Sequence, residues 1–107
     1  MSKFDTLEKL VAEIASRKTA SPDLSYTAKL LSQGVEKCAK KFGEEAFELA
    51  LAAVLKDKTH TANEAADVLY HLLVLLQSAD VSIEDVMAVL KSREGTSGNV
   101  EKASRRG

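Results

Sequence analysis

Cysteine, proline, glycine and aromatic residues are all scarce in this chain of 107 residues. Its single cysteine, Cys38, excludes an intramolecular disulfide and a thiolate metal cluster. Neither charge sign is in excess, since 15 basic and 16 acidic residues leave a formal charge of −1, and nucleic-acid binding through a broadly basic surface is therefore not expected. The longest apolar run, residues 68–76, includes His71 and is far too short to cross a membrane.

The N-terminus lacks the charged-then-apolar profile of a secretory signal, so we expect a soluble protein of the cytoplasm. The length suits one domain with one core. We expect that domain to span residues 1–93 and to be followed by a small, polar tail at residues 94–107. A monomer of this size buries only a modest part of its surface, so a second copy would be a natural source of additional core.

Alanine, leucine, lysine and glutamate dominate the rest of the sequence, which favours helices, and no stretch shows the period-two alternation of a strand. We therefore expect an all-α fold of about five helices, over residues 4–17, 26–32, 35–56, 62–78 and 82–93. The fourth segment is apolar nearly all round and must be buried on several sides. We expect it to lie at the centre of a homodimer, in a helical bundle that is completed by homodimerisation.

Two acidic pairs are the most informative feature of the chain. Glu45 with Glu48, and Glu64 with Asp67, are each spaced i, i+3, which puts both carboxylates of a pair on one helix face, where they repel. If the two helices pack antiparallel, the pairs converge with Glu44 beside them, and a divalent cation would offset the repulsion. Oxygen ligands favour Mg²⁺ or Mn²⁺ over zinc. Acidic spacings of this kind are also common on solvated faces, so an exposed acidic surface is the alternative.

Two lysines extend the acidic face toward the start of the third helix. Lys37 lies four residues before Lys41, which lies four residues before Glu45. Ordinary i, i+4 ion pairing, about 0.2–0.5 kcal/mol per pair, would explain such a stripe. Beside a metal site the lysines also fit a clamp for polyphosphate oxygens. This layout suits attack by a metal-activated water, with Glu44 or Glu45 orienting or deprotonating that water.

Two further side chains are candidate substrate contacts. His71 follows Asp67 by four residues and extends the same face, although a hydrogen-bonded structural histidine is the alternative. Tyr26 opens the second helix shortly before the lysines, and its ring serves either packing or substrate binding. No GxxxxGK[ST] loop is present, so a P-loop does not hold the phosphates.

The segments SYTAKLLSQGVEKCAKKFGEEAFELALAA and NEAADVLYHLLVLL carry a resemblance to a known family. Their EExxE and ExxD patterns are similar to those of the all-α nucleoside-triphosphate pyrophosphatases of the MazG type. More narrowly, the SYTAKL, KKFGEE and DVLYHLL runs resemble the phosphoribosyl-ATP pyrophosphatases, over roughly residues 4–93. The resemblance implies hydrolysis of phosphoribosyl-ATP between its α and β phosphates. That reaction gives phosphoribosyl-AMP and pyrophosphate, in the second step of histidine biosynthesis.

The same resemblance implies metal ligands at four positions, namely Glu45, Glu48, Glu64 and Asp67. It makes Glu44 a further acidic member of the motif, and four substrate-binding candidates also match the family, namely Lys37, Lys41, Tyr26 and His71. Two other hypotheses stay open. One is a MazG-type enzyme that hydrolyses other nucleoside triphosphates with the same acidic site, and the other is a non-catalytic helical dimer whose carboxylates are merely solvated.

Overall fold

The computed structural model of the protein describes residues 2–95, and all regular structure in that range is helical. The elements are α1 (Asp5–Ser16), a 3-10 turn η1 (Arg17–Thr19), α2 (Tyr26–Ser32), α3 (Val35–Val54), α4 (Lys58–Ser78) and α5 (Ile83–Ser92). The predicted all-α class is therefore confirmed. None of the helices described is both long enough and apolar enough to cross a membrane. The tail expected at residues 94–107 lies outside the described residues from residue 96 onward.

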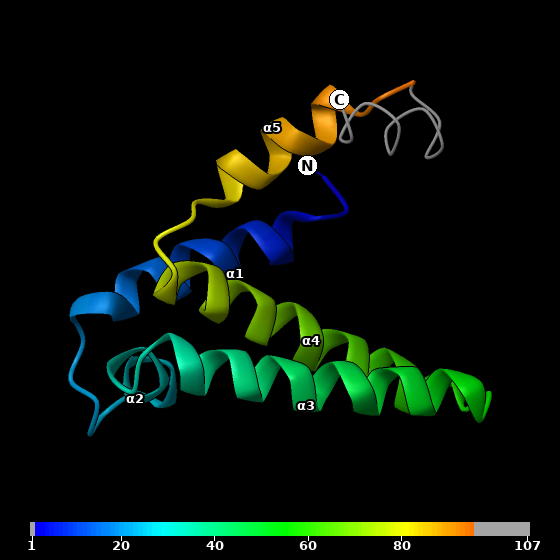
Figure 1. Ribbon diagram of the computed structural model, residues 1–107, viewed down its shortest axis with the longest axis horizontal. Helices are drawn as coiled ribbons and strands as arrows, with labels where there is room; N and C mark the ends of the chain where they lie inside the picture. Colours follow the sequence, from blue (N-terminus) through cyan, green and yellow to red (C-terminus); the bar gives the residue numbers. More distant parts are fainter. Residues whose placement is uncertain (1, 96–107) are drawn as a thin grey trace.

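The long helices α3 and α4 form an antiparallel hairpin (Figure 1). At the end of α3 the Asp57 N–H donates to the Ala52 carbonyl and the Lys56 N–H donates to the Ala53 carbonyl, while Lys56 takes the left-handed conformation with φ 60°. These bonds form a Schellman turn, which satisfies the last carbonyls of the helix. The Asp57 carboxylate then accepts a hydrogen bond from the His60 N–H at 3.0 Å and caps α4. The turn is consequently tight, and the two helices lie side by side.

The prediction that the fourth helix begins at residue 62 is wrong, because α4 begins at Lys58 and the expected connection at residues 57–61 is mostly helical. The other predicted boundaries agree with the structure to within two residues, the largest difference being the end of α3 at Val54 instead of residue 56. Ser82 caps α5, since its hydroxyl accepts a hydrogen bond from the Asp85 N–H at 3.1 Å.

The hydrophobic core lies where α1 and α2 meet α4 and the first half of α3. Its buried residues come from all four helices, namely Ile14, Leu30, Cys38, Leu73 and Val74. Cys38 is 1% exposed and its thiol donates to the Leu30 carbonyl at 3.3 Å. The single cysteine is therefore a packed core residue, as expected of a buried thiol.

Helix α4 packs against α1, α2 and α3 of its own chain. The chain itself therefore covers much of the apolar surface that the sequence gives to α4. Helix α5 touches the core through Ile83 and otherwise stands away from the α3–α4 pair (Figure 1). Large apolar side chains are exposed on the second half of α3 and on α5, and they include Phe47 and Leu90.

Candidate metal and phosphate site

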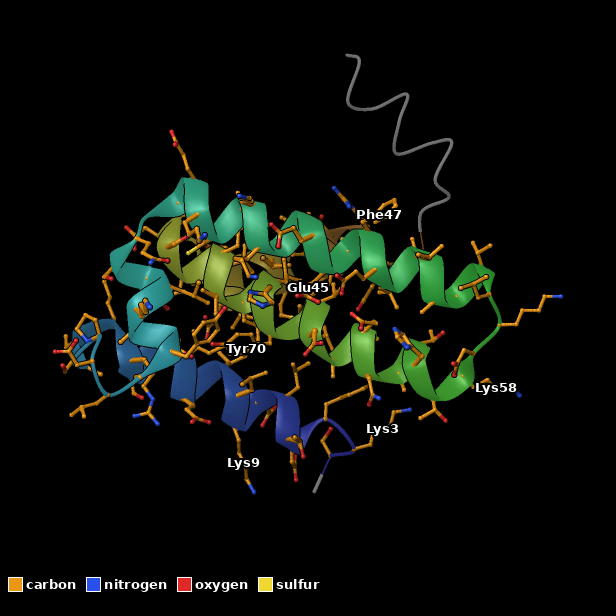
Figure 2. The ribbon with its side chains drawn as sticks, turned by 90° about the horizontal axis from the view of Figure 1, so that it is seen from below. Lys3, Lys9, Glu45, Phe47, Lys58 and Tyr70 are labelled. Atoms are coloured by element: carbon orange, nitrogen blue, oxygen red, sulfur yellow. The ribbon has the colours of Figure 1, made fainter. Side chains whose placement is uncertain are left out.

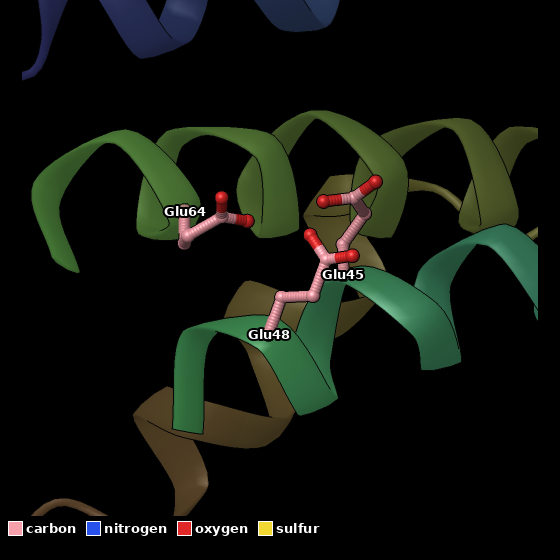
Figure 3. A group of neighbouring side chains, drawn as sticks. All are labelled: Glu45, Glu48 and Glu64. Carbon is pink, nitrogen blue, oxygen red and sulfur yellow. The ribbon is translucent and has the colours of Figure 1, made fainter. Parts of the chain in front are cut away.

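Three of the predicted acidic side chains converge between α3 and α4. One carboxylate oxygen from each of Glu45, Glu48 and Glu64 lies within 4.8 Å of the other two. Figure 3 shows Glu45 and Glu48 on α3 and Glu64 on α4, and Figure 2 shows Glu45 in the space between the two helices. The i, i+3 spacing puts the first two on one face, and the antiparallel hairpin brings the third opposite them. We call these three residues the glutamate group.

Asp67, the fourth predicted metal ligand, is not part of this group of three. It is exposed and follows Glu64 by three residues, which places it one turn farther along α4. Its negative charge acts on the buried ring of His71, where it partly offsets the lowering of that histidine's pKa by burial. Asp67 thus borders the glutamate group on the side toward His71.

Glu64 is the least solvated member of the glutamate group, with a side chain that is 14% exposed. Its Oε2 atom is buried and has no hydrogen-bond partner among the described residues. Burial, followed by the negative charges of Glu48 and Glu45, raises the pKa of Glu64 above the ordinary value of 4.5. Its other oxygen lies 3.3 Å from His60 Nε2, which partly offsets this effect when the imidazole is protonated.

The glutamate group therefore fits a hard divalent cation. It presents oxygen ligands alone, and one of those oxygens is buried without any other partner. Oxygen ligands from two or three carboxylates are the kind of donor set that Mg²⁺ and Mn²⁺ prefer in proteins. A cation would also remove the repulsion that raises the pKa of Glu64.

Lys41 lies at the N-terminal side of the glutamate group on α3. Its Nζ atom is 3.5 Å from Glu44 Oε2, so it pairs with Glu44 and not with Glu45, the partner that i, i+4 spacing suggested. The negative charges of Tyr26, when ionised, and of Glu44 raise the pKa of Lys41 above its ordinary value of 10.5, and the ammonium group is charged at neutral pH in either case. Lys37 is exposed one turn earlier, about 6 Å back along the helix axis.

His71 is buried on α4 with 7% of its surface exposed, and its Nδ1 atom has no hydrogen-bond partner among the described residues. Burial lowers the pKa of His71, while the carboxylates of Glu45 and Asp67 act in the opposite direction and Lys41 adds to the lowering. The ring is therefore neutral at pH 7, and the charges of these three side chains act on it. The expectation of a hydrogen-bonded structural histidine is not met at Nδ1.

Helix α2 is held in register with α4 by a hydrogen bond that the sequence did not predict. The hydroxyl groups of Thr27 and Tyr70 bond to each other across 43 positions of the chain. Tyr26 precedes Thr27, is 57% exposed, and lies close enough to Lys41 to change its pKa. The hydrogen bond therefore fixes Tyr26 at the lysine end of the site. The one sequence signal for this contact is the polar tip of Tyr70 within an apolar run.

The chain is similar to known proteins over nearly its whole length. The family described as phosphoribosyl-ATP pyrophosphohydrolase matches residues 7–94. A phosphoribosyl-ATP pyrophosphatase of Cereibacter sphaeroides is 61% identical over 99 residues, covering 92% of this chain and 96% of the relative. The enzyme of that name from Dinoroseobacter shibae is 59% identical over 102 residues, covering 95% of this chain and the whole of the relative. Another from a Jannaschia species is 57% identical over 99 residues, which are 92% and 97% of the two chains.

Proposed function

The chain belongs to the phosphoribosyl-ATP pyrophosphohydrolase family, and we infer that its activity is the one the family is named for. It hydrolyses phosphoribosyl-ATP to phosphoribosyl-AMP and pyrophosphate, a step of histidine biosynthesis. The observation that carries this conclusion is the match to that family over residues 7–94, in a chain whose acidic side chains converge beside a lysine. That pairing of carboxylates with ammonium groups is what a metal-dependent reaction on a polyphosphate requires.

We propose that the metal is Mg²⁺, which Mn²⁺ can replace, and that Glu45, Glu48, Glu64 and Asp67 hold it. The oxygen-only donor set of the glutamate group and the partnerless Oε2 of Glu64 support this assignment. Asp67 lies one turn beyond Glu64 and would have to turn inward to join them. When bound, the cation would neutralise phosphate oxygens and favour attack by water on the triphosphate.

The remaining side chains of the site then have separate tasks. Lys37 and Lys41 neutralise phosphate oxygens as point charges on the N-terminal side of the glutamate group. Glu44 or Glu45 accepts the proton of the attacking water. Glu44 is a candidate because it lies outside the glutamate group and is not committed to the metal. Glu45 is a candidate because it belongs to the group and therefore lies beside the metal.

Tyr26 and His71 complete the proposed site as substrate contacts. The neutral ring of His71 can donate or accept a hydrogen bond, and its unpartnered Nδ1 supports a role of this kind. Tyr26 is exposed at the lysine end, where its hydroxyl can meet the substrate beside Lys41.

We also propose that two copies of the chain associate through α3 and α5. On α3 three exposed apolar side chains share one face at i, i+4 and i+7, namely Phe47, Leu51 and Val54, which are 71%, 50% and 75% exposed. On α5, Met87 and Leu90 are about half exposed. On each helix, a row of exposed apolar side chains of this kind marks an interaction site.

The domain and the compartment are likewise proposals. Helices α1 to α4 share one core, which supports a single domain over residues 1–93. The cytoplasm is supported by the biosynthetic nature of the reaction, whose substrate is a nucleotide.

The test is pyrophosphate release from phosphoribosyl-ATP, with and without Mg²⁺, beside a panel of ATP and the common deoxynucleoside triphosphates. The proposed function predicts turnover that needs the metal and is confined to phosphoribosyl-ATP. Efficient turnover of the panel instead would keep the acidic site and assign the chain a MazG-type activity on other nucleoside triphosphates. No turnover of any substrate would leave the non-catalytic dimer as the explanation.

A further inference from the structure

An open pocket lies apart from the glutamate group, at the loop that leads into α2. Its volume is about 500 Å³, within the usual range for small-molecule sites. It is lined by five consecutive residues and one residue from the body of α2, namely Pro22, Asp23, Leu24, Ser25, Tyr26 and Lys29. None of these except Tyr26 has a role in the reaction described above.

Local hydrogen bonds fix the walls of this pocket. The Asp23 N–H donates to the Ser21 hydroxyl at 3.3 Å, and the Ser25 hydroxyl accepts from the Ala28 N–H at 3.1 Å. The bond between Thr27 and Tyr70 then ties α2 to α4, the helix that carries Glu64. The pocket therefore holds a set position relative to the glutamate group, and a ligand that spans both would meet them at a fixed separation.

The side chains around the pocket offer three kinds of contact. Lys29 is exposed and supplies an ammonium group, which suits a phosphate. Asp23 supplies a carboxylate that accepts hydrogen bonds from hydroxyl groups, as acidic residues do from ribose hydroxyls in nucleotide sites. Leu24 and Tyr26, 88% and 57% exposed, form an apolar wall. A phosphorylated sugar presents hydroxyl, phosphate and ring surface together and so matches all three.

Tyr26 joins the pocket to the catalytic region. It lines the pocket, and its hydroxyl also lies within electrostatic reach of Lys41, the lysine beside the glutamate group. A substrate with its triphosphate at the glutamate group and a second phosphorylated sugar at its other end would reach from one to the other past this ring. Phosphoribosyl-ATP is such a molecule, since it carries a ribosyl phosphate in addition to the triphosphate.

We propose that the pocket at residues 22–29 binds the ribosyl phosphate of phosphoribosyl-ATP, with Lys29 on the phosphate and Asp23 on the ribose hydroxyls. The proposal rests on the proposed function, and it makes the pocket the feature that selects this substrate over ATP. ATP lacks the ribosyl phosphate and leaves the pocket unused. Lys29 thus determines specificity and takes no part in the bond cleavage.

The test is steady-state kinetics of pyrophosphate release by the Lys29→Gln variant of the full chain, with saturating Mg²⁺. We expect KM for phosphoribosyl-ATP to rise about tenfold and kcat to stay unchanged. A rise of this size is what the loss of one charged hydrogen bond at a partly exposed site produces. The inhibition constant of ATP, measured as a competitor, should stay at the wild-type value. Lys29→Arg should restore most of the affinity because it keeps the charge.

Lys9→Gln is the matched control, since it removes the same charge from α1, where Figure 2 shows the side chain pointing away from the helices. An unchanged KM for Lys29→Gln would overturn the proposal, and so would a parallel weakening of ATP, because Lys29 would then contact the triphosphate. An equal rise in KM for Lys9→Gln would reduce the effect to overall charge and would overturn it too. Failure of the proposed function is distinguishable, because the wild-type chain would then release no pyrophosphate from phosphoribosyl-ATP.

Discussion

Binding of Mg²⁺ to the glutamate group should stabilise the folded chain, and Glu48→Gln should abolish that stabilisation. Three carboxylate oxygens within 4.8 Å exist only when α3 and α4 are paired, so the unfolded chain offers no equivalent site. At a free Mg²⁺ concentration ten times Kd, binding to the folded state adds about 1.4 kcal/mol. In a domain of about 100 residues that corresponds to a rise in Tm of roughly 6–11 °C.

The pH dependence of the metal-free chain gives a second part of this prediction. Because the pKa of Glu64 is raised above 4.5, the folded state binds this proton more tightly than the unfolded state. The free energy of unfolding should therefore increase as pH falls from neutrality through the raised pKa toward 4.5. With saturating Mg²⁺ the free energy of unfolding should instead decrease as pH falls, because protons compete with the metal for the carboxylates. Glu64→Gln should lose both effects.

Differential scanning calorimetry at pH 7, with Mg²⁺ titrated from zero, measures the stabilisation. Without metal, Glu48→Gln should melt at or slightly above the wild-type Tm, since it removes a like-charge pair that costs a few tenths of a kcal/mol. Glu36→Gln is the matched control on the same helix, outside the glutamate group, and should respond to Mg²⁺ like the wild type. A wild-type Tm that ignores Mg²⁺, or a Glu48→Gln variant that responds as strongly as the wild type, would refute the reasoning.

Four further predictions concern packing and assembly. Leu30→Ala should lower the free energy of unfolding in urea by about 2–5 kcal/mol, since Leu30 is 2% exposed, and a loss below about 1 kcal/mol would contradict the placement of the core. Tyr70→Phe should lower the free energy of unfolding by about 0.5–1.5 kcal/mol, because it removes the hydroxyl that bonds to Thr27. Adding Thr27→Val to that variant should then cost little more, whereas two fully additive losses would rule out the shared hydrogen bond. Gly43→Ala should raise it by about 0.5–1 kcal/mol in chemical denaturation, because a Cβ there meets nothing within 4 Å, and destabilisation would mean hidden close packing. Phe47→Asp should give a monomer by sedimentation, and an unchanged dimer would exclude the exposed face of α3 from the interface.

The helices could be predicted from the sequence wherever an apolar stripe or a capping side chain marks them. Ser82 does so at the start of α5, and at the start of α2 the sequence allows either Asp23 or Ser25 as the cap. In the structure Ser82 caps α5 and Ser25 caps α2. The start of α4 could not be found this way, because residues 58–61 are polar, include two threonines and show no apolar period. The carboxylate of Asp57 decides that boundary, and the close pairing of α3 with α4 follows from it.

The glutamate group could be predicted because most of its geometry is local. The spacing of Glu45 and Glu48 fixes their common face, and a short connection makes the next helix antiparallel, which leaves only the register of Glu64 to the tertiary structure. The separation of Asp67 from the group depends on that register and was not available from spacing. The pocket at residues 22–29 was also out of reach, because its position depends on a contact between Thr27 and Tyr70 that no sequence period encodes.

The most direct test of the account is the initial rate of pyrophosphate release from phosphoribosyl-ATP as a function of Mg²⁺, for the wild type and for Glu48→Gln at matched helicity. We predict a saturable dependence of the rate on Mg²⁺ in the wild type. In the variant the rate should be lower by about a hundredfold or more at any Mg²⁺ concentration. A fully folded Glu48→Gln chain that releases pyrophosphate at the wild-type rate would contradict the assignment of the glutamate group as the catalytic metal site.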